Sequence, residues 1–176
     1  KSAILKRAAP FILRRTKNQI LKELPPKQEQ TIHLEMTAEQ KEIYTRTISE
    51  VRESVREAFS EHTTAQGGIV ALSALTRLRQ VCLSPEILGK PTQKPAPKVE
   101  YLISKLKELQ AEGHAALIFS QFTRALDLLE KAANEAGLKY VRMDGKTPTE
   151  KRREIVHRFQ DAAEVPFFFI SLKTGG

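Results

Sequence analysis

The chain has very little cysteine and no apolar run long enough to span a bilayer. Cys82 is the only cysteine among the 176 residues, so a disulfide within the chain is excluded. Disulfides persist in oxidising compartments, and their exclusion favours a reducing, intracellular setting. No membrane partner is expected.

Several signatures of catalysis are also missing. The sequence has no Gly-x-x-x-x-Gly-Lys-Ser/Thr loop of the kind that cradles a triphosphate. Four histidines are scattered without the spacing of metal ligands: His33, His62, His114 and His157. Neither Ser120 nor Ser171 has a histidine nearby in the sequence that would activate it as a nucleophile. We therefore expect no catalytic residue, no metal and no cofactor held by this chain alone.

The charge is strongly unbalanced. Lysine and arginine number 29 against 21 aspartates and glutamates, a formal net charge of +8. This excess fits either a soluble basic surface or a polyanionic partner such as nucleic acid. Arg14, Arg15 and Lys17 form a local basic cluster after an apolar stretch. A cluster of this size is by itself typical of solvated surface.

Residues 1–89 have the pattern of a helical module. Alternation from Gln30 to Met36 predicts a short strand. Apolar residues at spacings of three and four predict a helix over 38–59, with one buried face. That face would contain Tyr44, Ile48, Val51, Val55 and Phe59.

A second helix and a linker complete the first half. The polar, glycine-ended stretch over 62–68 predicts a loop. The helix after it, over 69–82, would bury Leu72, Leu75, Leu78 and Cys82. Residues 90–97 hold three prolines, which forbid a regular helix and disfavour a central strand. They are predicted to link the module at 1–89 to a domain at 98–176.

Helices and apolar strands alternate over residues 98–176. The predicted helices cover 98–112, 123–136 and 148–160, and the predicted strands cover 115–120, 140–143 and 165–171. Such alternation implies right-handed crossovers and a parallel sheet. The expected fold is therefore α/β: a helical module followed by an incomplete parallel sheet flanked by helices. The aromatic run Phe167–Phe169 predicts a strand buried on both faces. As the last strand of the chain it is expected to be an unpaired edge that favours association.

Three polar loops follow the predicted strands. They are Ser120-Gln121, Asp144 to Thr147, and Ser171 to Gly176. Parallel strands end at the same edge of a sheet, so these loops should converge there. Hydroxyls, backbone N–H groups, lysines and helix N-termini suit phosphate groups. One such loop alone is an ordinary strand-to-helix connection, but three in register on a basic chain favour a phosphate-binding edge.

Six stretches match one known family in order along the chain. Pro10 to Lys17 resembles the PFxLRRxK signature of Swi/Snf-type helicase-like ATPases, and Leu24 to Tyr44 fits the stretch that follows it. Leu78 to Pro85 resembles the LRQxCNHP box, with Leu83 and Ser84 in place of Asn and His. Leu117 to Phe122 is similar to motif IV, Tyr140 to Thr147 with Arg152 resembles motif IVa, and Ile170 to Gly176 resembles the start of motif V.

The resemblance implies a fragment of an ATP-dependent double-stranded DNA translocase. It would cover a helical protrusion and the first part of the second RecA-like lobe. It implies DNA-phosphate contacts from Ser120, Gln121, Gly145, Lys146, Arg152, Ser171, Lys173 and Thr174. Arg14, Arg15 and Lys17 would either touch DNA or brace the lobes, and Gly175 and Gly176 would approach a nucleotide.

The same resemblance implies the partners and cofactors. The partners would be double-stranded DNA, the missing first RecA-like lobe and a DNA-bound protein complex. The setting would be the cytoplasm or nucleoid of a bacterium, or the nucleus of a eukaryote. ATP and Mg²⁺ would bind only in the intact parent, and this fragment would not hydrolyse ATP.

Two other functions stay open. In one, the chain is a helical protein-interaction module and its basic charge is incidental. In the other, it is a self-sufficient enzyme with a site that the sequence does not reveal. A salt titration of DNA binding separates the first from a DNA-binding role, because phosphate contacts weaken steeply with salt. Phosphate release from ATP, with and without DNA, separates the second.

Overall fold

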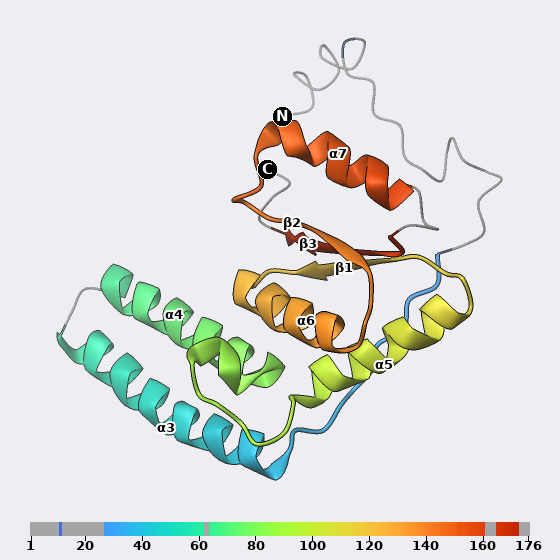
Figure 1. Ribbon diagram of the computed structural model, residues 1–176. Coiled ribbons are helices and arrows are strands. Elements are labelled where there is room, and N and C mark those ends of the chain that lie inside the picture. Colours follow the sequence, from blue (N-terminus) through green and yellow to red (C-terminus); the bar gives the residue numbers. More distant parts are fainter. Residues whose placement is uncertain (1–10, 12–26, 62–63, 161–164, 173–176) are drawn as a thin grey trace. The chain divides into compact units, whose positions relative to one another are not determined.

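The computed structural model describes residues 11, 27–61, 64–160 and 165–172 (Figure 1). The chain divides into two units, Lys1–His33 and Leu34–Gly176. Residues 27–37 form neither helix nor strand. The strand predicted over Gln30 to Met36 is therefore wrong. Its side chains alternate, but no strand of the described residues pairs with it, and a strand needs a partner to be stable.

The second unit begins with helices and continues as alternating helices and strands. The elements are α3 (Ala38–Glu61), α4 (Thr64–Leu83), the 3-10 helix η2 (Pro85–Leu88), α5 (Pro97–Ala111), β1 (Ala116–Ser120), α6 (Thr123–Glu135), β2 (Tyr140–Met143), α7 (Thr149–Gln160) and β3 (Phe167–Ser171). From residue 97 onward every predicted helix and strand is confirmed, with ends shifted by one or two residues.

Helices α3 and α4 form an antiparallel pair with a narrow seam. Near the start of α3, the Gln40 amide donates to the Val81 carbonyl at the end of α4, at 2.8 Å. At the other end, a Cβ added to Gly67 would lie 2.8 Å from the Phe59 ring. The buried positions of the seam are mostly small or medium-sized: Gln40, Thr47, Val51 and Ala58 on α3, and Gly67, Ala74 and Val81 on α4.

The seam corrects three predictions about this region. Leu72 and Leu75 are exposed, at 67% and 58%, and half of Phe59 is exposed. The stretch 64–68 is helical, so the predicted loop over 62–68 is wrong for those residues. The reason is that α4 is apolar around much of its circumference, and its small residues allow a closer approach to α3 than its leucines would.

The three strands form one parallel sheet in the order β1-β3-β2. The central strand is β3, which pairs with β1 through Ala116–Phe167 to Ser120–Ser171. It also pairs with β2 through Tyr140–Phe167 to Met143–Ile170. The expectation of an unpaired last strand is therefore wrong, because the chain returns between the two earlier strands. Burial of β3 on both faces is confirmed.

Helices cover both faces of this sheet (Figure 1). On one face, Phe167 and Phe169 pack in a core with side chains of α5 and α6, including Leu106 and Leu126. On the other face, Phe168 packs with Val141 and with Ile155 and Phe159 of α7. The two faces of β3 thus lie in two separate cores, and this packing fixes the position of the strand's carboxyl end.

Candidate nucleic-acid interface at the carboxyl edge of the sheet

The predicted convergence of loops is confirmed for the described residues. Ser120 and Ser171 are paired in register at the ends of β1 and β3. Asp144 follows the end of β2, whose last residue, Met143, pairs with Ile170. Because all three strands are parallel, the turns after β1 and β2 leave from the same edge as Ser171.

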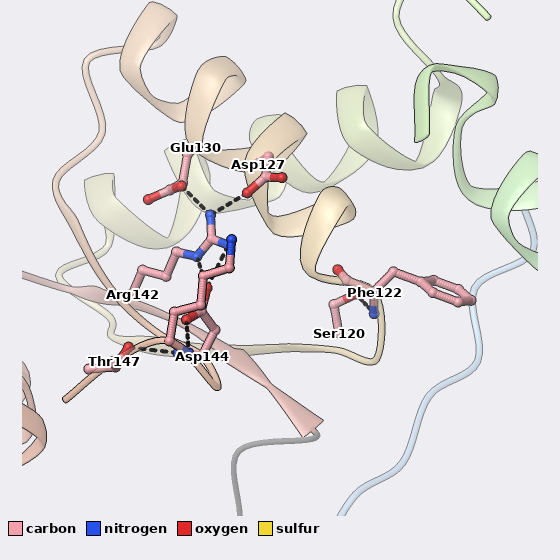
Figure 2. Close-up of polar contacts among 8 residues, drawn as sticks. Ser120, Phe122, Asp127, Glu130, Arg142, Asp144 and Thr147 are labelled. Atoms are coloured by element: carbon pink, nitrogen blue, oxygen red, sulfur yellow. Dashed lines mark hydrogen bonds and ion pairs between the residues drawn. The ribbon is translucent and has the colours of Figure 1, made fainter. Parts of the chain in front are cut away.

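Ser120 shapes the turn between β1 and α6. Its Oγ accepts a hydrogen bond from the Phe122 N–H at 3.1 Å and donates to the Phe122 carbonyl at 3.2 Å (Figure 2). The hydroxyl therefore serves its own turn. Gln121, between these two residues, is partly exposed. Ser171 is 1% exposed, so its side chain lies beneath the surface of this edge.

The turn from Asp144 to Thr147 is held by three short-range hydrogen bonds. The Lys146 N–H donates to Asp144 Oδ1 at 2.9 Å, and the Asp144 N–H donates to Thr147 Oγ1 at 3.0 Å. The Thr147 N–H donates to the Asp144 carbonyl at 3.0 Å. Gly145 and Lys146 are exposed at the tip of this turn. The turn therefore presents a fixed backbone to solvent.

Gly145 is a glycine that the fold itself does not require. A Cβ added there would meet no atom within 4 Å, and its φ lies outside the left-handed region. By contrast, the caps after η2, α5 and α6 need glycine, because Gly89, Gly113 and Gly137 have φ of 72°, 73° and 68°. The missing side chain at Gly145 leaves the backbone of the turn open to close approach.

Arg142 ties this turn to α6. Its Nη1 contacts both Asp127 Oδ1, at 2.7 Å, and Glu130, while Nε and Nη2 bond Asp144 Oδ2 at 3.1 and 2.7 Å (Figure 2). The Arg142 side chain is only 18% exposed. A guanidinium offers five donors in a planar fork, and this one contacts three carboxylates. The position of the turn is therefore fixed by a charged contact as well as by its own hydrogen bonds.

The same contacts shift two pKa values. Burial alone would lower the pKa of Arg142, but its hydrogen bonds to the three carboxylates outweigh burial and raise it. Burial alone would raise the pKa of Asp144, but the Lys146 N–H and the Arg142 guanidinium outweigh it and hold that pKa below 3.8. Both groups are thus charged at neutral pH, and the turn keeps its shape there.

Arg152 reaches the turn from α7. Its Nε donates to the Thr147 carbonyl at 3.3 Å, and its side chain is partly exposed. Together with Lys146, it brings a second cation to the turn that Gly145 leaves open. Gly145, Lys146 and Arg152, which the family resemblance implied as contact residues, are therefore brought together.

Other predicted site residues lie outside the described residues: Arg14, Arg15, Lys17, Lys173, Thr174, Gly175 and Gly176. The sequence reasoning missed Arg142 and its carboxylates. One signal was available, since an arginine inside an apolar strand needs a carboxylate, and Asp127 and Glu130 share one face of α6 at a spacing of three. Among the described residues, no group of three His, Cys, Asp or Glu could hold a metal ion. Within the same residues, no helix is long and apolar enough to cross a membrane.

Two family models together match most of the chain. The SNF2-related domain matches residues 2–87, and the helicase conserved C-terminal domain matches residues 97–176. A human relative is the SWI/SNF-related matrix-associated actin-dependent regulator of chromatin subfamily A member 1. It is 33% identical over 186 residues, which cover 99% of this chain and 17% of that protein. The chain therefore spans about a fifth or less of the length of the curated relatives it matches.

Solved structures share the fold. The Sulfolobus solfataricus SWI2/SNF2 ATPase core in complex with double-stranded DNA superposes with a TM-score of 0.72 at 25% identity. That match covers 97% of this chain and 36% of the archaeal one. The C-terminal part of the Fun30 ATPase domain superposes with a TM-score of 0.63 at 21% identity, over 86% of this chain and 71% of that one, and supports the fold alone.

Proposed function

Because this chain belongs to the Swi/Snf-type helicase-like family, we propose that it supplies phosphate-backbone contacts to duplex DNA in an ATP-driven translocase. The observation that carries the proposal is the turn at Gly145. It combines an open backbone, two adjacent cations and a rigid anchor at the edge where three parallel strands end. The archaeal relative whose core was solved with double-stranded DNA lends the proposal its substrate class.

The chemistry of the turn suits phosphate better than bases. Lys146 and Arg152 are cations, and the backbone at Gly145 can be approached closely by a bulky oxyanion. Such contacts read charge and backbone geometry and carry no information on base sequence. Binding should therefore be equal on unrelated duplexes and should weaken steeply with salt.

ATP hydrolysis is assigned to the parent protein. The sequence has no triphosphate loop, and the described residues hold no ligand set for Mg²⁺. These residues do not fit an ATP·Mg²⁺ site on their own, so we propose that this chain does not turn over ATP without the first RecA-like lobe. The regulator-of-chromatin name of the human relative suggests a DNA-bound protein complex as the parent's substrate.

Fluorescence anisotropy on two unrelated duplexes, across a range of salt, tests the DNA-binding role. Three neutralised phosphates predict a slope of log affinity against log salt of about −2.7 on both duplexes. Lys146→Ala with Arg152→Ala should flatten that slope by about one to two units. The matched control is Lys107→Ala with Lys131→Ala, exposed cations more than two turns from the starts of α5 and α6. Equal effects of the two pairs would contradict the proposal.

One observation favours the alternative of a protein-interaction module. Ile69, Leu72 and Leu75 expose an apolar strip on the side of α4 that faces away from its seam with α3. Apolar docking depends only weakly on salt, whereas binding through phosphate contacts weakens steeply as the salt concentration rises. A wild-type chain that fails to bind either duplex at low salt would leave this alternative in place of the DNA-binding role.

A further inference from the structure

A second basic site lies next to the edge of the sheet. An open hollow of about 400 Å³ is lined by the end of α4, the start of α5 and the ends of β1 and β3. Arg79 and Lys98 are its charged residues, and Gln121 and Phe122 lie on its sheet side. No aspartate or glutamate lines it. The hollow thus offers positive charge without a competing carboxylate.

The two arginines near the end of α4 have different partners. Arg77 pairs with Glu50 of α3 at 3.3 Å, so its charge is used within the helical pair. Arg79, two residues later, is in no ion pair of the described residues, and its guanidinium carbon lies 5.9 Å from the centre of the Phe122 ring. A cation at that distance is held near the ring by its quadrupole, while its N–H donors stay available. Lys98 likewise has no carboxylate partner among the described residues.

Direct contacts fix the walls of the hollow relative to each other. Arg124 of α6 donates to the Ile87 carbonyl of η2 at 2.9 Å, which joins the end of the helical module to the helix that follows β1. Ser84 caps η2 by accepting from the Glu86 N–H at 3.3 Å. The end of α4, which carries Arg79, is therefore held in place beside the edge of the sheet. The helical module and the sheet thus form one continuous surface there.

We infer that this hollow binds a phosphate of the DNA backbone, with Arg79 and Lys98 as its cations and the Gln121 amide as a donor. The inference rests on the proposed DNA-binding function and extends it to the helical module, whose role would then include direct contact with the duplex. The binding chemistry is that of a phosphodiester, so it makes no demand on base sequence.

The test is the salt dependence of duplex binding by Arg79→Gln with Lys98→Gln. Loss of one phosphate contact should flatten the slope by about one unit. The control, Arg77→Gln with Lys107→Gln, removes the same charge from the same two helices and should leave the slope unchanged. The conservative pair Arg79→Lys with Lys98→Arg should also keep the wild-type slope. Both positions are exposed, and circular dichroism would verify that each variant is folded.

The outcomes separate this inference from the proposed function. Wild-type chain that binds no duplex would overturn both. The inference alone would be overturned in two cases in which the wild type binds duplex. In one, the slope of the Arg79→Gln, Lys98→Gln variant is unchanged; in the other, the control variant flattens the slope equally. A nucleotide is the other source of phosphate at this edge. If ATP displaced duplex from the wild type but not from the Gln pair, the hollow would be a nucleotide site and the inference would be wrong.

Discussion

The helical pair α3–α4 and the three-stranded sheet bury side chains of very different size. The sheet buries Phe167, Phe168 and Phe169 in succession, the first and third under α5 and α6 and the second under α7. The seam between α3 and α4 is built largely on small residues such as Gly67 and Ala74, while Ile69, Leu72 and Leu75 of α4 are exposed. The sheet is stabilised by the volume of the side chains it buries, and the α3–α4 pair is stabilised by the close approach of its two backbones. They should therefore respond to opposite kinds of substitution.

The largest expected effect is in the sheet. Phe169 is fully buried and stacks on Tyr140, with ring centres 4.7 Å apart. Phe169→Ala should lower the free energy of unfolding by about 3–5 kcal/mol, since it removes the ring and leaves a cavity. Phe119→Ala, on β1 but 54% exposed, should cost less than about 1 kcal/mol. Urea unfolding followed by circular dichroism measures both. Similar losses for the two variants would show that Phe169 is not in a packed core.

The next largest effect is expected where the turn is anchored to α6. Arg142→Met should lower the free energy of unfolding by about 2 kcal/mol, because it removes the guanidinium from the poorly exposed Asp144 and Glu130 carboxylates. The control is Arg46→Met, which breaks an exposed pair with Glu42 one turn away on α3 and should cost about 0.5 kcal/mol or less. Thermal unfolding of the two variants measures the difference. Equal losses would mean that the three carboxylates do not depend on Arg142.

Two adjacent glycines test the helical seam. Gly68→Ala should raise the free energy of unfolding by about 0.5–1 kcal/mol, because the added Cβ meets nothing within 4 Å and alanine favours a helix. Gly67→Ala should instead lower it by about 1 kcal/mol, because the Cβ would press on the Phe59 ring. Denaturant midpoints give the sign of each change. A gain for both variants would mean that the seam does not need a glycine.

The smallest expected effect is on acid stability. Asp144 has a pKa below its unfolded value of 3.8 in the folded chain. Its stabilising contribution is therefore complete well above 3.8, begins to fall at about pH 5, and is lost as pH falls through the lower folded value. Asp144→Asn removes this titration and should flatten the decline of stability from about pH 5 downward. Thermal midpoints measured at several acidic pH values test it, and an unchanged decline in the Asn variant would show that other carboxyls dominate.

The sheet region was predictable because its sequence signals agree with one another. Apolar runs mark the strands, and Gly113 and Gly137 end two helices with positive φ. Parallel topology then places Ser120, Gly145 and Ser171 at one edge without further information. Helix α4 is apolar on two sides. Periodicity predicted that the side with the leucines is buried, whereas in the structure the side with the small residues packs against α3.

Spacing could place Asp127 and Glu130 on one face of α6, but it could not pair them with Arg142. Arg142 lies 15 and 12 residues after Asp127 and Glu130, so only the crossover from α6 to β2 brings them together. The sequence does not distinguish Arg77 from Arg79. The packing of α4 against α3 places Arg77, but not Arg79, beside the Glu50 carboxylate. The exposed Gly145 was predicted, yet its open surroundings and ordinary φ came from the structure.

Gly145→Gln tests whether the glycine at the carboxyl edge is needed for folding or for binding DNA. The fold has room for the side chain, so the free energy of unfolding should change by less than about 0.5 kcal/mol. A phosphate approaching the backbone would be blocked, so affinity for duplex DNA should fall about tenfold, equivalent to about 1.4 kcal/mol, equally on unrelated sequences. Anisotropy titrations of wild type and variant, with matched unfolding curves, measure both quantities. Unchanged stability together with unchanged affinity would show that DNA does not approach the turn at Gly145.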